Sequence, residues 1–165
     1  MTRRSLLTTL AALGLGGGAA HTVNADTKGG KASGTAKVSL SDAEWKARLT
    51  AEQYRVLRHE GTEPPGSSAL NREKRKGTYH CAGCELPLFS SATKYESGTG
   101  WPSFYQPLPD SIGTKTDYKL IFPRVEYHCV RCEGHQGHVF DDGPAPTGKP
   151  YCNNGVALKF VPAAA

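Results

Sequence analysis

The 165-residue sequence has no large excess of one charge, no internal repeat and no apolar run long enough to span a membrane. Its formal charge of +5 is too small to indicate a nucleic-acid partner, and we expect none. The apolar run from Leu6 to Ala20 is shorter than the roughly 20 residues of a membrane-spanning helix. Glycine (19) and proline (11) are plentiful, which favours a loop-rich β fold over a helical bundle.

The N-terminus has the layout of a bacterial signal peptide. A twin arginine, Arg3-Arg4, precedes the apolar run, and Val23-Asn24-Ala25 fits a cleavage site that needs small residues. We expect residues 1–25 to be a twin-arginine signal peptide, residues 26–40 a flexible polar linker, and residues 41–162 the folded domain. The protein is then periplasmic, with no stable membrane span after processing. An uncleaved membrane anchor is the alternative.

The folded part begins with two helix-start signals. Ser41–Glu44 and Thr50–Gln53 are capping-box patterns, and the second helix should end near Gly61. From Gly77 onward, short runs of β-branched and aromatic residues are separated by Gly, Pro, Asp and Asn. Strands are expected at residues 78–81, 86–89, 118–122, 126–130, 139–140 and 156–161. The pattern predicts a small antiparallel β domain with one or two helices at its N-terminal edge.

Four of the five cysteines form two C-x-x-C pairs. Cys81 and Cys84 are separated from Cys129 and Cys132 by 44 intervening residues. Two such turns can close a tetrahedron of thiolates around one structural Zn²⁺, and Gly83 suits a sharp turn. Two disulfides are the alternative in an oxidising compartment. Such small rings would crosslink the fold little, and export after folding lets zinc reach the thiols first.

Cys152 is the remaining thiol, and two histidines precede it in the sequence. A nucleophilic thiol has to ionise and needs a proton donor nearby, and histidine commonly serves both needs. His135 and His138, joined through Gly137, could face one pocket together with Cys152. The alternatives are a small buried hydrophobic residue for the cysteine and satisfied polar groups for the histidines.

Several longer motifs also occur in order along the chain. They are Gly61-Thr62-Glu63-Pro64-Pro65, Cys81-x-x-Cys84-x-x-Pro87-Leu88-Phe89, Lys94-Tyr95, Gly100-Trp101-Pro102-Ser103-Phe104, Cys129-x-x-Cys132-x-x-His135-x-Gly137-His138-Val139-Phe140-x-Asp142-Gly143-Pro144-x-Pro146-Thr147-Gly148 and Tyr151-Cys152-x-Asn154. Together they resemble the peptide-methionine (R)-S-oxide reductase family (MsrB), from about Trp45 to Pro162.

The resemblance implies a mainly β, Mss4-like fold of two small antiparallel sheets around a zinc-stapled core, with short N-terminal helices. It implies an oxidoreductase that returns methionine-R-sulfoxide residues of oxidised proteins to methionine. The Cys152 thiolate would attack the sulfoxide sulfur and become a sulfenic acid. A protonated His138, or else His135, would give a proton to the sulfoxide oxygen. We expect the protein to be a monomer.

The same resemblance assigns three further residues. Asn154 would fix a water or the substrate oxygen, and Trp101 would offer an apolar face to the S-methyl group. Phe140 is also assigned to substrate binding. Plain core packing is the alternative for Trp101, since aromatic residues serve cores well.

The chain departs from the family pattern at three positions. Thr99 stands where many members have a second, resolving cysteine, so an external thioredoxin-like reductant is expected. Pro150 replaces a common arginine, which removes a cation that would favour a thiolate. Gln136 replaces a common leucine and is expected to alter the pocket wall slightly. The rival interpretations are a non-enzymatic zinc module that binds a protein or nucleotide on the same fold, and a cysteine hydrolase.

Overall fold

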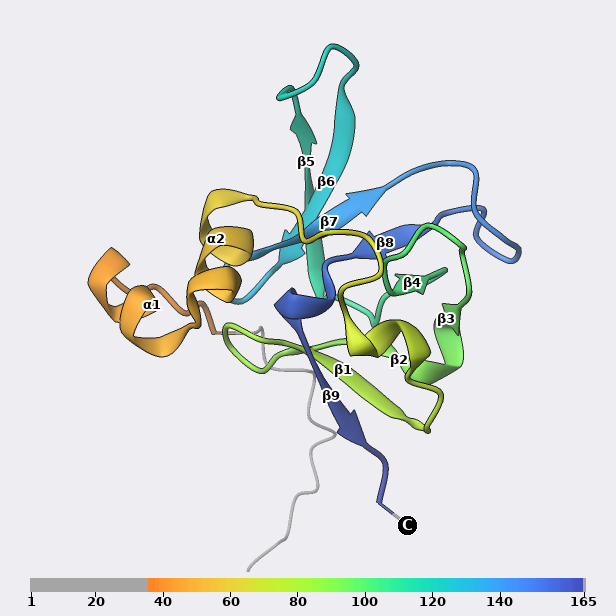
Figure 1. Cartoon of the computed structure of the whole chain (residues 1–165), viewed down its shortest axis with the longest axis horizontal. Helices are drawn as coiled ribbons and strands as arrows, with labels where there is room; N and C mark the ends of the chain where they lie inside the picture. Colours follow the sequence, from red (N-terminus) through yellow and green to blue (C-terminus); the bar gives the residue numbers. More distant parts are fainter. Residues whose placement is uncertain (1–35, 165) are drawn as a thin grey trace, which may run out of the picture. The chain divides into compact units, whose positions relative to one another are not determined.

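The structure is a computed structural model that describes residues 36–164 (Figure 1). The signal peptide predicted at residues 1–25 and most of the linker predicted at residues 26–40 lie outside the described residues. In the described end of that linker, the Val38 backbone N–H donates to the Arg131 carbonyl at 2.7 Å. Val38 and Leu40 pack against the core. No helix within residues 36–164 is long and apolar enough to cross a membrane.

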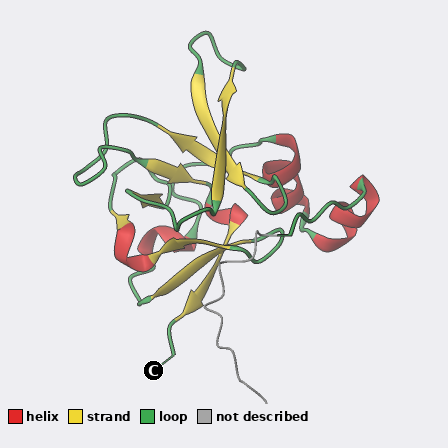
Figure 2. Cartoon of the chain, turned by 180° about the vertical axis from the view of Figure 1, so that it is seen from behind, coloured by secondary structure: helices red, strands yellow, loops and turns green. Residues whose placement is uncertain are grey.

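Within residues 36–164, two short helices come first, and both begin as predicted. Helix α1 is Asp42–Arg48 and helix α2 is Ala51–His59. Ser41 and Thr50 are the N-caps, and each forms a reciprocal capping box with the residue three positions later. Helix α2 ends where Glu60 adopts a left-handed conformation (φ 53°). Both helices lie together at one side of the strands (Figure 2).

The strands form two antiparallel sheets, which confirms the predicted fold class. The first sheet has the order β2-β1-β9, with β1 Gly77–Cys81, β2 Pro87–Ser90 and β9 Leu158–Pro162. The second has the order β3-β4-β8-β7-β6-β5. Its strands are β3 Lys94–Tyr95, β4 Ser103–Phe104, β5 Ile112–Asp117, β6 Arg124–Cys129, β7 His135–Val139 and β8 Tyr151–Asn153. In the described part of the chain, three 3₁₀ turns complete the order of elements: η1 Ala69–Arg72, η2 Ser91–Thr93 and η3 Gly155–Ala157.

Aromatic side chains join the two sheets. Phe89 of β2 stacks on Phe104 of β4, with ring centroids 4.3 Å apart. Tyr79 of β1 meets Phe104 edge-on at 4.9 Å, and Tyr127 of β6 completes the contact with Phe89 at 6.0 Å. All four rings are fully buried. Each such aromatic pair contributes about 0.5–1.5 kcal/mol beyond the area it buries, so this cluster fixes the sheets against each other.

The strand predicted at residues 118–122 is wrong. These residues form the loop between β5 and β6, and the strand lies earlier, at Ile112–Asp117. Apolar, β-branched residues favour strands because they pack on a half-buried surface, and here Ile121 is 94% exposed. Strands β3, β4, β5 and β8 were not predicted, because they are short or polar. Of the run predicted at residues 156–161, the first part is the η3 turn.

Candidate active site and metal centre

One residue from each of the six strands contributes to a single cross-strand row. The row is Tyr95, Ser103, Cys152, His138, Glu126 and Lys115. We call the side of the sheet that carries it the reactive face. Opposed residues in antiparallel strands have Cβ atoms about 4.5–5.5 Å apart. Cys152 therefore lies between His138 and Ser103, and the Ser103 hydroxyl is 3.7 Å from the Cys152 sulfur.

A β-bulge in β7 turns both histidines toward the reactive face. Residues three apart on a regular strand point to opposite faces. The pairing of β7 with β6 skips Gln136, which has no opposing residue. This extra residue reverses the alternation, so His135 lies on the same side as His138, and their ring centroids are 5.4 Å apart.

The close approach of β7 and β8 depends on Gly137. A Cβ at this position would collide with the backbone carbonyl oxygen of Cys152. Glycine is therefore the residue that lets β8 come near enough to set Cys152 opposite His138.

A carboxylate holds the His138 ring. His138 Nε2 is 2.8 Å from Asp117 Oδ2, which also accepts from Arg124 Nη2 at 2.7 Å. The Lys119 backbone N–H donates to the other oxygen at 2.9 Å. That backbone donor, followed by His138 and Arg124, holds the pKa of Asp117 far below its usual range. Burial lowers the pKa of His138, and the Asp117 hydrogen bond opposes part of that shift.

A second carboxylate, that of Glu126, holds the His135 ring. His135 is 1% exposed, and its Nδ1 is 2.7 Å from Glu126 Oε1. Its Nε2 has no hydrogen-bond partner among the described residues. Burial would raise the pKa of Glu126, but His135 and Lys115 outweigh it and the pKa is lowered. The sequence analysis missed both Asp117 and Glu126. Neither acid belongs to a spaced motif, and their partners are set by strand register.

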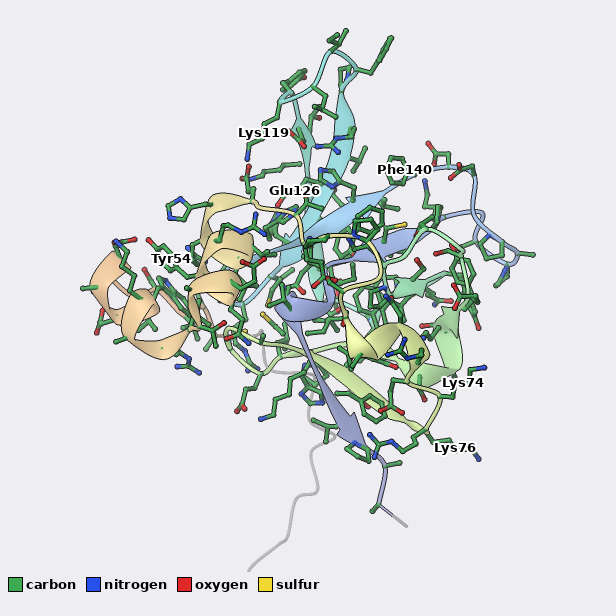
Figure 3. The ribbon with its side chains drawn as sticks, viewed as in Figure 1. Tyr54, Lys74, Lys76, Lys119, Glu126 and Phe140 are labelled. Atoms are coloured by element: carbon green, nitrogen blue, oxygen red, sulfur yellow. The ribbon has the colours of Figure 1, made fainter. Side chains whose placement is uncertain are left out.

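These groups face a pocket of about 270 Å³. Its wall includes Cys152, His138, Trp101, Phe140, Thr99 and Arg124. Cys152 and Trp101 are half-buried, and Trp101 lies outside the buried core cluster. Phe140 is 41% exposed and stands at the end of β7 (Figure 3). Asn154 also lines this pocket. Five of the six predicted catalytic and substrate-binding residues therefore line one cavity, and the sixth, His135, lies next to His138 outside the lining.

Asn154 and Glu63 tie together the segments that carry the pocket. Asn154 Oδ1 accepts the Glu63 backbone N–H at 2.9 Å, and its Nδ2 donates to the Gln136 carbonyl at 3.0 Å. The Glu63 carbonyl accepts the Trp101 indole N–H at 3.1 Å. The buried Glu63 carboxylate accepts the backbone N–H of Gly155 at 2.6 Å. The sequence assigns Glu63 no role of its own, and the Gly61–Pro65 motif is the signal that could have identified it.

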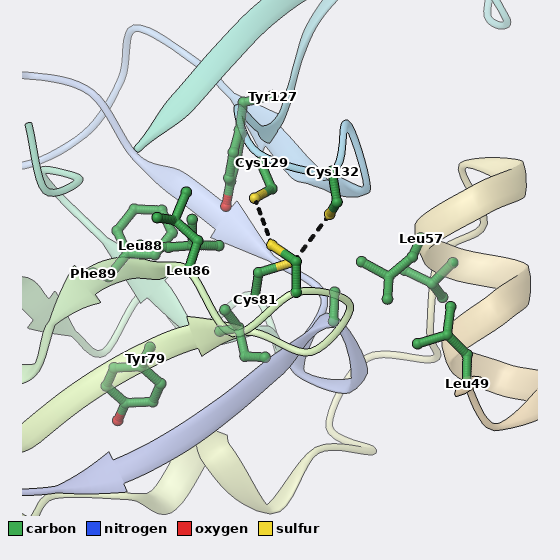
Figure 4. Close-up of a cluster of buried hydrophobic side chains, with 14 of the residues drawn as sticks. Leu49, Leu57, Tyr79, Cys81, Leu86, Leu88, Phe89, Tyr127, Cys129 and Cys132 are labelled. Carbon is green, nitrogen blue, oxygen red and sulfur yellow. Dashed lines mark hydrogen bonds between the residues drawn. The ribbon is translucent and has the colours of Figure 1, made fainter. Parts of the chain in front are cut away.

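The four cysteines of the two C-x-x-C pairs lie together, on the turns that follow β1 and β6 (Figure 4). All four are buried free thiols, and their sulfurs lie within 4.8 Å of one another. The sulfur distances are 3.6 Å for Cys81–Cys132 and 3.5 Å for Cys84–Cys129. A disulfide would need about 2.05 Å. A tetrahedron with metal–sulfur bonds of about 2.3 Å has edges of about 3.8 Å, so the cluster fits a closed four-coordinate metal.

The two C-x-x-C turns share one backbone pattern. In each, the residue after the second cysteine donates its N–H to the first cysteine's carbonyl at 2.8 Å. That residue is Glu85 in one turn and Glu133 in the other, and both have a positive φ, 62° and 59°. Gly83 lies within the first turn, as expected, and packs against the sulfurs, where a Cβ would be 3.4 Å from Cys132 Sγ. The left-handed residue that follows this turn is Glu85.

Gln136 faces the cysteine cluster, which corrects its expected place in the pocket wall. Because it is the bulged residue of β7, its side chain leaves the reactive face. Its Nε2 lies 3.4 Å from Cys81 Sγ, and the side chain is fully buried. The same residue's carbonyl accepts a hydrogen bond from Asn154, so Gln136 connects the cysteine cluster with the pocket.

The chain is similar in sequence to known proteins over most of its length. The SelR domain family matches residues 49–162. A peptide methionine sulfoxide reductase B1 of Oryza sativa is 52% identical over 74% of this chain. An MsrB protein of Leptospira interrogans is 54% identical over 75% of this chain and 95% of its own length. Methionine-R-sulfoxide reductase B2 of Rattus norvegicus is 49% identical over 76% of this chain and 77% of its own. The chain spans 58% of the length of the rice protein.

Proposed function

Since this chain belongs to the SelR domain family, we propose that it is an oxidoreductase that reduces methionine-R-sulfoxide residues of oxidised proteins to methionine. The observation that carries the proposal is the pairing of Cys152 with His138 at the wall of a pocket that Trp101 also lines. The choice of the R epimer follows the name of the rat relative. A non-enzymatic zinc module would need the cysteine cluster and would have no use for this pairing.

Cys152 acts as the nucleophile in this proposal. Its thiolate attacks the substrate sulfur, the sulfur–oxygen bond breaks, and the oxygen passes to Cys152 as a hydroxyl. The products are methionine and a Cys152 sulfenic acid, so two electrons move from the cysteine sulfur to the substrate sulfur. The Ser103 hydroxyl beside Cys152 Sγ supports this role, because it can donate a hydrogen bond to a thiolate.

His138 supplies the proton to the sulfoxide oxygen. Asp117 accepts from Nε2, and Nδ1 makes no hydrogen bond to any residue within 36–164. The imidazolium form therefore has an unused N–H to give. Because burial lowers the pKa of His138 below its ordinary value of about 6.5, this form becomes scarcer as pH rises toward neutrality. His135 lies behind His138, with its Nδ1 on Glu126, and positions it.

The pocket orients the substrate side chain. Trp101 presents its indole to the S-methyl group, with its N–H held by the Glu63 carbonyl, and Phe140 forms the outer wall. Asn154 holds the Glu63 backbone in turn, so it positions Trp101 while lining the pocket itself. One Nδ2 hydrogen of Asn154 remains for a water or the substrate oxygen.

The metal in this proposal is Zn²⁺. Four thiolates select zinc or an iron–sulfur centre, and a closed tetrahedral site suits a structural zinc. The turns that carry the cysteines follow β1 in one sheet and β6 in the other. The ion would therefore hold the two sheets together, and it would take no part in the reaction.

Regeneration of Cys152 requires an external thiol. Thr99 lines the pocket, and a threonine hydroxyl cannot condense with a sulfenic acid. The other four cysteines are buried in the metal cluster. Two external thiols return the sulfenic acid to a thiol, releasing water and a disulfide. Export through the twin-arginine signal would place the protein in the periplasm, which is kept oxidising. The reductant in this proposal is therefore a thioredoxin-like domain that receives its electrons from a membrane protein.

The test uses N-acetyl-methionine sulfoxide, each epimer separately, with dithiothreitol. We expect turnover of the R epimer, and its loss in Cys152→Ser with metal content and melting temperature unchanged. Substantial turnover by the Cys152→Ser protein would refute the assignment.

The proton donor has its own test. His138→Ala should lower the rate by about a hundredfold or more, the effect of losing a general acid. If His138→Ala turns over normally while His135→Ala does not, the donor is His135.

A further inference from the structure

The loop between β5 and β6 carries an exposed apolar surface. We define the hairpin tip as residues 118–123, with the sequence Tyr-Lys-Leu-Ile-Phe-Pro. Tyr118, Ile121 and Phe122 are 76%, 94% and 79% exposed. Hairpin loops ordinarily use Gly, Asn and Asp. Contiguous apolar side chains that face solvent mark an interaction site, and this tip projects beyond the remaining strands (Figure 1).

The hairpin tip is adjacent to the pocket. The last paired residues of the hairpin are Asp117 and Arg124. Asp117 holds the His138 ring, and Arg124 lines the pocket. Phe122 is two residues from Arg124, so their Cα atoms are at most about 7 Å apart. In Figure 3 the tip rises above Phe140, the exposed apolar residue of the pocket wall.

The pocket is too small to hold a segment of polypeptide chain. Its volume of about 270 Å³ lies below the range of about 300–1,000 Å³ that suits drug-sized ligands. The remaining residues of a polypeptide substrate must therefore lie on the surface around it. An extended chain advances about 3.3 Å per residue, so residues two or three positions from the methionine sulfoxide reach the hairpin tip.

The charges at the tip favour an uncharged partner. Lys119 Nζ is 2.6 Å from Glu60, and Arg124 pairs with Asp117 at 2.7 Å. Both cations are thus already neutralised, and the free surface of the tip is apolar. Methionine is commonly buried in protein cores, so the residues that share its face, two positions away along a strand, are often apolar and become exposed when the protein unfolds.

We propose that the hairpin tip binds the apolar side chains that flank methionine sulfoxide in an extended segment of an unfolded polypeptide. The proposal rests on the proposed function and makes it specific for substrate class. The tip supplies affinity for the polypeptide, while the pocket performs the chemistry on one side chain.

The test is an Ile121→Ser/Phe122→Ser double variant with three substrates. One peptide carries methionine-R-sulfoxide between leucines and valines, a second carries it between serines and glycines, and the third substrate is N-acetyl-methionine-R-sulfoxide. We expect KM for the apolar-flanked peptide to rise about tenfold, with kcat unchanged and the other two substrates unaffected. A tenfold change equals about 1.4 kcal/mol of binding. Val161→Ser, an exposed apolar position on β9 (39% exposed), is the matched control and should change none of the three.

The outcomes separate this inference from the proposed function. No turnover of N-acetyl-methionine-R-sulfoxide by the parent protein overturns the proposed function. If the double variant loses kcat/KM equally on all three substrates, or loses none on any, only the role of the tip is overturned and the proposed function stands. The same holds if the parent protein is a dimer that the double variant dissociates, because the tip is then an interface between copies. Tip-dependent binding to neutral phosphatidylcholine vesicles, with unchanged peptide kinetics, also overturns it.

Discussion

Asp117→Asn removes the charge that faces His138 while keeping the size of the side chain. The asparagine oxygen can still accept the Lys119 backbone N–H, so the start of the loop is retained. What is lost is the charged acceptor 2.8 Å from His138 Nε2. Asp117 raises the pKa of His138, whereas burial, Arg124 and His135 lower it. Removing Asp117 therefore lowers the pKa of His138 further.

The size of the change follows from this hydrogen bond. A hydrogen bond to a charged group contributes about 1.5–3 kcal/mol, and about 1.4 kcal/mol is a factor of ten in an equilibrium. We expect the protonated share of His138 at neutral pH to fall about tenfold, the lower end, because the unpaired Arg124 can turn toward solvent. With protonated His138 as the donor, the alkaline decline of the rate shifts to lower pH. The maximal rate should also fall about a hundredfold, because the ring loses its orientation.

The assay is a single turnover without reductant, which removes the pH dependence of the external thiol. Reduced enzyme is mixed with N-acetyl-methionine-R-sulfoxide, quenched, and the methionine product is measured between about pH 5 and pH 8. At low substrate concentration, the pH dependence of the second-order rate constant of this single turnover reports the free enzyme, as that of kcat/KM does in the steady state. Asp110→Asn, at an exposed turn position, is the matched control and should leave the profile unchanged. An alkaline limb that stays in place, or moves to higher pH, would refute the reasoning.

Three further predictions concern the metal and the sulfenic acid. Cys84→Ser should release the metal and abolish cooperative melting, because the binding energy of a structural zinc, about 10 kcal/mol or more, is largely folding energy; a melt like the parent's would contradict this. Gln136→Leu removes the donor 3.4 Å from Cys81 Sγ, so zinc should transfer faster to a chromogenic chelator, and an unchanged transfer rate would remove this role. One equivalent of substrate without reductant should leave a trappable sulfenic acid on Cys152 with full metal retention. A disulfide from Cys152 to a cluster cysteine, with metal released, would show that the chain resolves itself.

Features with local causes could be predicted from the sequence. The capping boxes at Ser41 and Thr50 start both helices, because the N-cap and its partner are only three residues apart. Each C-x-x-C pair presents two thiols from one turn, whatever the rest of the fold, so the spacing already indicated the cluster that joins the sheets. Thr99 could also be read directly as the position without a second thiol.

Strand register determines the features that the sequence did not reveal. Asp117 and Glu126 belong to no motif, and they hold His138 and His135 because β5, β6 and β7 pair in one particular register. A bulge at Gln136, invisible in the sequence pattern, turns both histidines to one face. Register depends on contacts across many residues of chain, and a shift by one residue would send each of these side chains to the other side of its strand.

The exposure of the hairpin tip also could not be predicted from the sequence. Its β-branched and aromatic residues predicted a strand at residues 118–122, because such residues pack well on a neighbouring surface. The hairpin carries these side chains past the edge of the core, where no described residue covers them, and Ile121 and Phe122 remain in solvent. Composition determined that the segment is apolar, and the tertiary structure determined that it remains in solvent, next to the strand ends that carry Asp117 and Arg124.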